Sequence, residues 1–579
     1  MNMAIETKIE GMVRLVQKNK RARFREIAKA LSWDEQSVEK IALILEKANL
    51  AKTHYPLNMF ESPSVSILPR QQPEAEAEGV GKVIDTYEIS PREGHVLGSV
   101  RIYHSPSERR PAYQLILPQM SPYTRAYLEY LKEAISKMLP AASEEKSNEA
   151  VEGNFVIRHA AISEMLGKDL GRESTNLDTL TDIALNEMYG LGELEALIGD
   201  QKLEEIVINS ASIPVAVYHR KFGWLKTNVR MPSEADIENY SQQIARKVGR
   251  QISTLSPVLD AHLGTGDRVN ATLYPISSHG NTITLRLFAR NPWTIVTFTK
   301  PEVKSMSVEM AALIWQALQY EMNVLVAGGT ASGKTSALNG LLCLVQPFQR
   351  IVTIEDTREL MLPSYQWNWV PLITRLPNPE GQGEVTMLDL LVNSLRMRPD
   401  RIVMGEIRRK NEAEVLFEAM HTGHSVYSTI HADTGNQVLK RLIEPPIEVP
   451  ASEVEDLHLI LVQYRDRRKN VRRTLELSEV ISGAGGPELN RVYAWRARDD
   501  TFQSVKPPHR YMQELNLRTG FSEAECNEDR SSKEAILGWM AKNGLENIED
   551  VGRVMKLYYT EPESIMEAAE KGIPPSKVL

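Results

Sequence analysis

Cysteine is nearly absent from this sequence, which contains only Cys343 and Cys526 among 579 residues. The two lie far apart, and neither has another Cys or a His nearby at the spacing of metal ligands. A disulfide framework and a zinc module are therefore not supported as organising features. Unpaired thiols of this kind are typical of a protein in the reducing cytoplasm, which is the location we expect.

Long apolar runs and a positive net charge are also missing. No segment reaches the roughly 20 apolar residues that cross a bilayer. The first residues, MNMAIETKIEGMVRLVQ, carry acidic side chains and lack the apolar stretch of a signal peptide. Membrane association is therefore expected only through a partner or at the surface. The net charge of -8 argues against a dedicated nucleic-acid binder.

The overall composition is that of a globular protein, with 42% hydrophobic and 25% charged residues. At about 150 residues per domain, the length predicts three or four domains. Changes in composition and periodicity place the boundaries as follows: a winged-helix-like module at 1–68, a linker with a small strand and helix region at 69–155, a small α/β module at 156–298, a core of alternating strands and helices at 299–510, and a helical tail at 511–579.

The winged-helix-like module leaves two interpretations open. Such a module often reads DNA, but it serves almost as often to dock proteins. Its second helix, FREIAKALS, has no cluster of arginines, so we do not expect DNA as a partner.

The core predicts an α/β fold, because strands that alternate with helices build a parallel sheet. Ligands of such sheets bind outside the carboxyl ends of the strands. Between an apolar strand and a helix lies GGTASGKT at 328–335, which matches the phosphate-loop pattern G-x-x-x-x-G-K-[ST]. Backbone N–H groups of such a loop surround phosphate oxygens, Lys334 is expected to pair with the β and γ phosphates of ATP, and Thr335 is expected to bind Mg²⁺. The predicted nucleotide-binding residues are Gly328, Gly329, Thr330, Ala331, Ser332, Gly333, Lys334, Thr335 and Ser336.

Carboxylates follow two further strands of the core. RIVTIEDTREL ends its strand in Glu355 and Asp356, and RIVMGEIR ends its strand in Glu406. At the edge of the sheet that carries the phosphate loop, these carboxylates could hold Mg²⁺ or orient the attacking water. The alternative is that they only cap the helices that follow the strands.

Two histidines flank another core strand, in HTGHSVYSTIHADT. His424 precedes SVYSTI and His431 follows it. An imidazole near the nucleotide could sense the γ phosphate through a hydrogen bond. Taken alone, each histidine is more consistent with a structural role than with this one.

Together these segments form an ordered set: a phosphate loop, the acidic box TIEDTREL, the Walker B variant LRMRPDRIVMGEIR and the histidine box TGHSVYSTIHAD. In that order they resemble the type II/type IV secretion ATPase superfamily. YHRKFG, RLIEPPIEVP and RRTLELSEV are similar to its archaeal branch of pilus, secretion and archaellum motors. The resemblance covers about residues 160–510.

The resemblance implies a PAS-like N-terminal domain at 156–298, a RecA-like ATPase core at 299–510 and a hexameric ring. It places the acidic box on Glu355 and Asp356, the Walker B carboxylate on Glu406, and the histidine box on His424 and His431. Metal contacts are then expected from Thr335, Glu355, Asp356 and Glu406.

Family members also use arginines of the N-terminal domain against a nucleotide, which would make Arg268 and Arg286 catalytic residues here; the alternative for each is an ion pair with a surface carboxylate. Two features depart from the family pattern. Arg409 follows GEIR where many relatives have Gly or Asp, and the four-cysteine module of many bacterial export ATPases is missing.

A basic run, RDRRKNVRR at 465–473, lies between two strand-like segments and is expected at the tip of a β-hairpin. A solvated tip is one interpretation, and a contact to anionic lipid or to an acidic loop of a membrane partner is the other.

Three functions remain open from the sequence. The first is a hexameric ATPase at the cytoplasmic face of the membrane, docked on a polytopic platform protein and driving a pilus-like filament or protein export. The second is a DNA-transfer motor of conjugation or uptake. The third is a regulator that uses the nucleotide as a switch.

Overall fold

The computed structural model describes residues 5–56, 61–68, 81–90, 97–104, 110–138, 148–171, 176–263, 266–288, 292–377, 381–466, 468–469 and 471–579. The predicted linker at 69–80 lies outside these residues. The chain divides into two compact units, Met1–Phe288 and Ala289–Leu579, which we call the first and the second unit and describe separately.

The first unit begins with a winged-helix arrangement. Its elements are α1 (Lys8–Asn19), β1 (Ala22–Arg23), α2 (Phe24–Ala30), α3 (Glu35–Lys47), β2 (Ala51–His54) and β3 (Ser64–Ile67), with the strands in the order β1-β3-β2. Thr7 starts α1 with a capping box, in which its side chain accepts from a backbone N–H of the first turn and the carboxylate of Glu10 accepts from the backbone N–H of Thr7. Asp34 caps α3 by accepting from the N–H of Ser37 at 2.7 Å.

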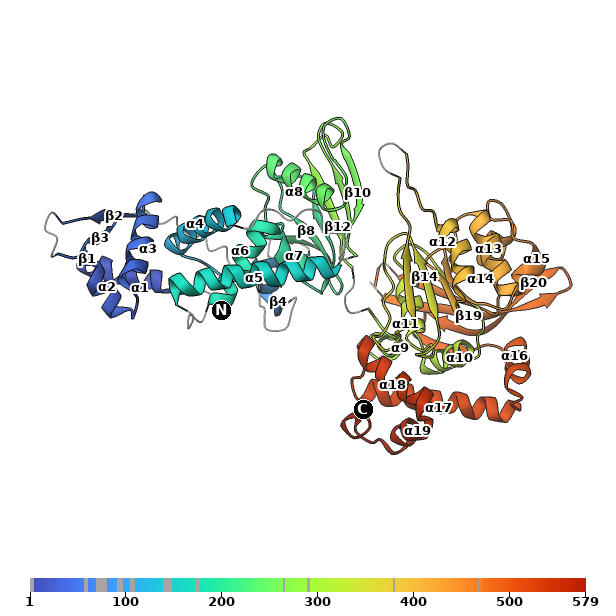
Figure 1. Cartoon of the computed structure of the whole chain (residues 1–579). Coiled ribbons are helices and arrows are strands. Elements are labelled where there is room, and N and C mark those ends of the chain that lie inside the picture. The colour runs from blue at the N-terminus through green and yellow to red at the C-terminus, as the bar shows by residue number, and fades with distance from the viewer. Residues whose placement is uncertain are drawn as a thin grey trace. The chain divides into compact units, whose positions relative to one another are not determined.

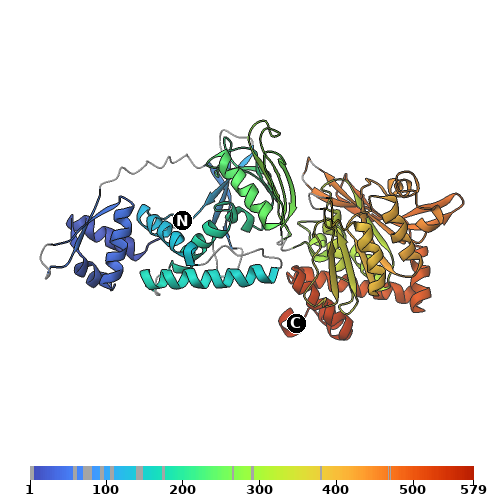
Figure 2. The same cartoon turned by 45° about the horizontal axis from the view of Figure 1, so that its top comes forward.

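Three longer helices share a hydrophobic core with this module. They are α4 (Pro122–Met138), α5 (Asn148–Leu170) and α6 (Leu177–Tyr189). Asp169 of α5 joins this helix to α3 and α4, because it accepts hydrogen bonds from Lys40 Nζ at 2.5 Å and from the Tyr127 hydroxyl at 2.8 Å. Helix α5 runs through residue 155, where the sequence places a domain boundary; Figure 2 shows it along its length.

A nine-stranded sheet forms the rest of the first unit. Its strands follow in the order β10 (Val258–His262), β11 (Arg268–Thr272), β12 (Thr282–Arg286), β7 (Leu203–Ile208), β8 (Ala216–His219), β9 (Gly223–Thr227), β6 (Pro111–Ile116), β5 (Gly98–His104) and β4 (Lys82–Ile89). Neighbouring strands are antiparallel except β6 and β9, which are parallel. Strands β4 to β6, from the region assigned to 69–155, thus extend the sheet of the following region. Two helices, α7 (Leu194–Gly199) and α8 (Glu234–Lys247), contribute to the core of this sheet.

The second unit is a mixed α/β domain, so the fold class predicted from the sequence is confirmed. Its nine strands follow in the order β15 (Trp369–Ile373), β14 (Ile351–Glu355), β16 (Arg401–Met404), β17 (Ser425–Ile430), β13 (Val324–Gly328), β18 (Leu459–Asp466), β19 (Val471–Gly483), β20 (Gly486–Arg496) and β21 (Thr501–Ser504). The pairs from β15 to β18 are parallel, and those from β18 to β21 are antiparallel.

Helices cover both faces of this sheet (Figure 1). Alternate residues of β13 point to opposite faces, as a pleated strand requires. Val324 and Val326 join the cluster of α9 (Ile295–Thr299), α10 (Val308–Gln319) and α11 (Lys334–Leu342). Leu325 and Ala327 join the cluster of α12 (Met387–Ser394), α13 (Lys410–His421), α14 (Gly435–Ile443) and α15 (Ala451–Val454). Burial on both faces explains why these strands are continuous apolar runs in the sequence.

The C-terminal helices pack on the α10 side of the sheet (Figure 1). They are α16 (Arg510–Thr519), α17 (Glu523–Lys542), α18 (Ile548–Thr560) and α19 (Pro562–Lys571). The fully buried Lys533 of α17 donates to Asp529 at 2.5 Å and to the Tyr558 hydroxyl at 2.9 Å. The tail is therefore held by a buried polar network as well as by apolar contact.

No helix in the described part of the chain combines the length and the apolar character needed to cross a membrane.

Candidate nucleotide-binding site

The phosphate loop runs from the end of β13 to the start of α11, and its glycines are dictated by close contacts. Gly328 has a φ of +152°, and a Cβ there would lie 2.4 Å from the backbone oxygen of Gln463 on β18. A Cβ on Gly329 would lie 2.8 Å from Oδ1 of Asp433. Gly333, with a φ of +96°, adopts the left-handed conformation immediately before α11. The loop can therefore adopt this conformation at the edge of the sheet only with glycine at these positions.

The loop has the features of an anion site. The unpaired N–H groups at the start of α11 favour a negative charge, as at any helix N-terminus. Ser332 is buried, and its hydroxyl has no hydrogen-bond partner within the described residues. Thr330, Ala331 and Ser336 are exposed, and Thr335 is half-buried in the first turn of α11. An orphaned donor beside unpaired amides fits a phosphate group.

Lys334 points back over the loop. It is 9% exposed, and its Nζ donates to the carbonyl oxygen of Gly329 at 3.2 Å. The same ammonium lies 3.2 Å from Nδ1 of His431. Burial lowers the pKa of Lys334, against the raising effect of Glu406 and other nearby carboxylates.

His431 connects Lys334 to Glu406. Its Nε2 lies 3.1 Å from Oε1 of Glu406, while its Nδ1 faces Lys334. A neutral imidazole with its proton on Nε2 satisfies both contacts, because Nδ1 then accepts from the ammonium and Nε2 donates to the carboxylate. Burial, followed by the charge of Lys334, lowers the pKa of His431 and favours this neutral form.

Arg408 joins Glu406 to the acidic box. Its Nε donates to Oε2 of Glu406 at 2.8 Å, and its NH1 donates to Oδ2 of Asp356. Asp356 also accepts from the Thr374 hydroxyl at 3.2 Å. The following residue, Arg409, is exposed and precedes α13. The carboxylates at the ends of β14 and β16 are thus bridged by one guanidinium.

Glu355 is turned toward the backbone. Its side chain is buried, and Oε1 accepts from the N–H groups of Glu359 at 2.9 Å and Leu360 at 3.0 Å. Oε2 is also buried and has no hydrogen-bond partner among the described residues. Burial raises the pKa of Glu355 to about 7. One oxygen of this carboxylate is therefore engaged in shaping the loop after β14.

The four residues predicted as metal ligands are only partly assembled. Asp356 and Glu406 share Arg408, whereas Glu355 faces the loop that follows β14. Within the described residues, no group of three or more His, Cys, Asp or Glu side chains has the arrangement of a metal site. A phosphate-loop Mg²⁺ usually takes one or two protein ligands together with water and phosphate, which Thr335 and the carboxylates at the strand ends can provide.

The two predicted histidines lie at opposite ends of β17. His431 follows the carboxyl end, beside the phosphate loop, and His424 precedes the amino end. At roughly 3.3 Å per residue the strand separates them by well over 15 Å. His424 lies near the hydroxyl of Thr422, with Nδ1 and Oγ1 3.3 Å apart. The structure therefore does not bring His424 to the phosphate loop.

The two predicted arginines belong to the first unit. Arg268 on β11 and Arg286 on β12 lie directly opposite each other in the strand register, and both are exposed. Arg268 makes an ion pair with Asp260 at 3.0 Å, and Arg286 lies opposite Glu205 of β7. The structure thus brings the two arginines together at one end of their strands.

A cavity of about 490 Å³ opens beside the phosphate loop, and it includes residues that the sequence pattern did not identify. Asp433, Gln437 and Arg441 come from the histidine loop and α14, and Gln463, Tyr464 and Arg465 come from β18. Arg441 also donates to the backbone oxygen of His431 at 2.8 Å and so holds the histidine loop. In the sequence, the only sign of this contact is the position of Arg441 in a helical segment ten residues after His431.

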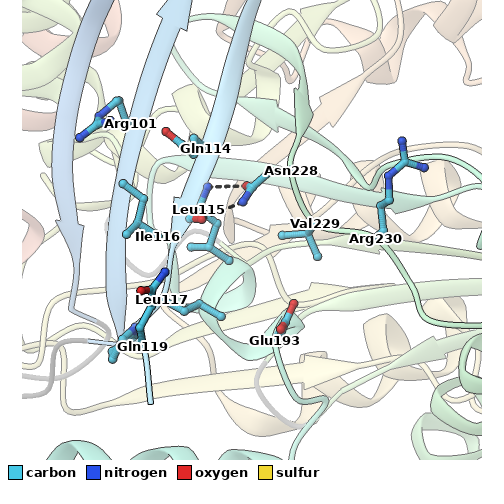
Figure 3. Close-up of a pocket in the computed structure, with 11 residues that line it drawn as sticks. Arg101, Gln114, Leu115, Ile116, Leu117, Gln119, Glu193, Asn228, Val229 and Arg230 are labelled. Carbon is cyan, nitrogen blue, oxygen red and sulfur yellow. Dashed lines mark hydrogen bonds between the residues drawn. The ribbon is translucent and has the colours of Figure 1, made fainter. Parts of the chain in front are cut away.

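A second cavity, of about 520 Å³, lies in the first unit between β6 and the segment that follows β9 (Figure 3). The side chain of Asn228 closes the gap in the sheet there, because its amide pairs with the backbone N–H and C=O of Leu115 at 2.7 and 3.0 Å. Arg101, Glu193 and Arg230 stand apart around it (Figure 3).

Comparison with known proteins identifies the family that this chain resembles. The family model described as "Type II/IV secretion system protein" matches residues 187–463. An uncharacterised protein of Methanocaldococcus jannaschii is 33% identical over 407 residues, which cover 68% of this chain and 72% of that protein. A protein of Mycobacterium tuberculosis whose name refers to conjugal transfer is 32% identical over 264 residues, covering 44% of this chain and 73% of that protein. Among solved structures, the VirB11 ATPase of the Brucella suis type IV secretion system is 24% identical over 49% of this chain and 94% of its own, with a TM-score of 0.25.

Proposed function

This chain belongs to the type II/IV secretion ATPase superfamily and is an ATPase, and on that premise we propose that it is the motor of a membrane-embedded machine. In this proposal a homo-hexamer hydrolyses ATP to drive assembly of a type IV pilus-like filament, or protein export, through a polytopic platform protein. The observation that carries it is the chain of contacts from Lys334 through His431 to Glu406 at the phosphate loop.

Each residue has a role in this proposal. The backbone amides of the phosphate loop hold the triphosphate, and Lys334 transfers its contact from the Gly329 carbonyl to the phosphate oxygens. Glu406 orients the attacking water, and His431 reports the state of the γ phosphate because it contacts both Lys334 and Glu406. Mg²⁺, when bound through Thr335 and the carboxylates, neutralises charge on the transferred group.

Arg268 and Arg286 complete the proposal as groups of the first unit that act on a nucleotide. Their shared register position and their exposure support a joint role. An arginine supplied to a phosphoryl-transfer site contributes about 10³- to 10⁵-fold in rate in related systems. Closing of the two units around ATP and their opening after hydrolysis would then move the platform protein.

The location we propose is the cytoplasmic face of the membrane. The hairpin formed by β18 and β19 carries the exposed Arg468 and Lys469 at its tip, and these side chains are suited to anionic lipid. Recovery of the protein from native membranes together with one polytopic protein would support a platform-bound motor, and its recovery alone after crosslinking would oppose it.

The experiment that tests the proposal begins with Lys334→Ala in the purified full chain. We expect ATP turnover to be abolished, because the side chain that pairs with the phosphates is gone. Unchanged turnover would refute the phosphate-loop assignment. Tight ATP binding by the wild-type chain without hydrolysis under any stimulus would instead favour a nucleotide-switched regulator.

Mixed rings test the action of Arg286 between subunits. Arg286→Ala chains are mixed with wild-type chains in increasing proportion, and ATP turnover is measured at constant total protein. If one subunit supplies Arg286 to its neighbour, activity falls more steeply than the wild-type fraction. A strictly linear decline would argue against action in trans.

A DNA-transfer motor is the second candidate, favoured by the Mycobacterium tuberculosis relative and by the winged-helix module. DNA-stimulated ATP turnover that falls steeply with salt would support it, since phosphate contacts release counterions. If DNA does not change the ATP turnover, the filament or export motor remains the preferred function.

A further inference from the structure

The basic run at 465–473 is not simply a solvated tip, because its two ends face the interior of the second unit. Arg465, near the end of β18, lines the cavity of the phosphate loop, and Arg472 and Arg473 lie near the start of β19. At the tip itself Oδ1 of Asp466 accepts from the backbone N–H groups of Arg468 at 2.8 Å and Lys469 at 3.2 Å. Among the described residues of the run, Arg468 and Lys469 are exposed, whereas Arg465, Arg472 and Arg473 make other contacts.

Arg472 reaches the phosphate loop directly. Its Nε donates to the backbone oxygen of Ala331 at 3.3 Å. Its Cδ also lies 3.6 Å from the position that a Cβ on Gly333 would occupy, which is ordinary packing distance. This side chain therefore makes a hydrogen bond to the loop at Ala331 and passes near Gly333.

Ala331 is the position where the loop most needs support. Its φ of +59° lies in the left-handed region, which a residue with a Cβ adopts only at a cost. Such a conformation persists where surrounding contacts fix it. The hydrogen bond from Arg472 to the Ala331 carbonyl is a contact of that kind.

The neighbouring residue fixes the direction of Arg472. Arg473 is buried and pairs with both carboxylate oxygens of Asp500, at 2.8 and 3.0 Å, while its NH1 donates to the carbonyl of Val303 at 3.0 Å. Successive side chains of a strand point to opposite faces, so anchoring Arg473 away from the loop directs Arg472 toward it. A hydrogen bond of 2.9 Å from Gln463 to Thr474 ties β18 to β19 at the same level.

We infer that Arg472 is a positioning residue for the phosphate loop, holding Ala331 in the left-handed conformation and thereby setting the affinity for the nucleotide. The inference rests on the proposed nucleotide binding at this loop. Without Arg472 the loop spends only a fraction of its time in the binding conformation, and the apparent affinity falls by that fraction. The hairpin that carries the basic tip thus contacts the phosphate loop through Arg472.

Equilibrium binding of MgADP to the full chain, measured by calorimetry, tests this inference without turnover. We expect Arg472→Ala to weaken binding about three- to tenfold, the worth of one hydrogen bond. Arg468→Ala is the matched control, because it removes the same charge from the exposed tip of the same hairpin and should change the affinity less than about twofold. Arg472→Gln is measured alongside, and thermal melting of both Arg472 variants confirms that they are folded.

A second pair of variants separates position from charge. Glycine adopts a positive φ without cost, so in the Ala331→Gly background the Arg472→Ala change should weaken binding by a smaller factor than in the wild-type background. An equal factor in both backgrounds would mean that Arg472 acts only through its charge, and the inference would be overturned. Wild-type affinity of Arg472→Ala, or an equal loss in Arg468→Ala, would overturn it too.

Lys334→Ala shows which proposal has failed if one does. If Lys334→Ala binds MgADP as tightly as the wild type, the assignment of the nucleotide site to this loop is rejected. Loss of binding in Lys334→Ala together with unchanged binding in Arg472→Ala would leave the site in place and reject the role of Arg472 alone.

Discussion

The imidazole Nε2 of His431 lies 3.1 Å from the carboxylate of Glu406, which follows a different strand of the same sheet. The contact joins the end of β17 to the end of β16, and the second nitrogen of the ring extends it to Lys334 on the phosphate loop. Any group that draws Lys334 away from His431 therefore also changes the surroundings of Glu406. In the proposed mechanism, this chain of contacts couples nucleotide binding to the orientation of the attacking water by Glu406.

His431→Ala should reduce the rate of ATP hydrolysis by roughly 10- to 100-fold while ATP affinity changes by less than about threefold, because the imidazole orients Glu406 and Lys334 without replacing the phosphate loop. Steady-state turnover and nucleotide binding are measured in parallel. His424→Ala is the matched control at the other end of β17, and we expect its turnover to equal that of the wild type. Equal losses in both variants would mean that strand integrity, and not the contact to Glu406, limits the rate.

Glu406→Gln should retain ATP binding and lose about 10²- to 10⁴-fold in hydrolysis, because the amide cannot act as the carboxylate that orients water. Glu355→Gln should lose far less, since the amide oxygen can still accept from the N–H groups of Glu359 and Leu360. Single-turnover hydrolysis of bound ATP separates the two variants. If the larger loss occurs in Glu355→Gln, that residue takes the water-orienting role.

The sequence predicts those parts of the site that depend on local patterns. The phosphate loop is local because Gly328, Gly333 and Lys334 act within one turn between a strand and a helix. The direction of each parallel strand then places Glu406 and His431 at the same edge of the sheet. By the same rule His424 belongs to the opposite edge, so the structure places one of the two histidines of the segment beside the phosphate loop and the other away from it.

Side-chain partners across the fold could not be predicted in this way. The bridge from Arg408 to Asp356 joins positions 52 residues apart, and the contact from Arg472 to Ala331 joins positions 141 apart. Each contact depends on which face of a strand or loop is turned toward the partner residue. The pattern of charges along the sequence does not encode this. The parallel pairing of β6 with β9 is likewise nonlocal, and it attaches the strands β4, β5 and β6 to the sheet that follows.

Arg401→Leu should lower the free energy of unfolding of the second unit by about 3–5 kcal/mol, because a fully buried guanidinium is removed from partners that then stay unpaired. Arg401 donates to Gln349 at 2.8 Å, to the Tyr427 hydroxyl at 2.5 Å and to the carbonyl of Leu318 at 2.8 Å. Urea unfolding followed by tryptophan fluorescence measures the change.

The exposed Arg396 provides the control for Arg401. Arg396→Leu should change the free energy of unfolding by no more than about 0.5 kcal/mol, as surface substitutions do. A small effect of Arg401→Leu as well would show that the three acceptors find new partners.

The first unit should lose stability in mild acid because of His219. This residue is 2% exposed, and its Nδ1 accepts from the N–H of Lys221 at 3.0 Å, so the ring is held in its neutral form. Burial lowers the pKa of His219 to about 4 from an ordinary value of 6.5. Between these values the unfolded chain binds more protons than the folded one, and stability therefore falls as the pH decreases from 6.5 to 4 and is level below that range.

The contribution of His219 amounts to at most about 3 kcal/mol across that interval. Hydrogen exchange in peptides that cover β8 and β9, measured at several pH values between 4 and 7, follows it locally. His219→Gln should flatten the pH dependence of exchange protection, because the buried imidazole that resists protonation is gone. His279→Gln, at an exposed position of the same unit, should leave the wild-type dependence in place. The same slope in all three proteins would assign the acid sensitivity to groups other than His219.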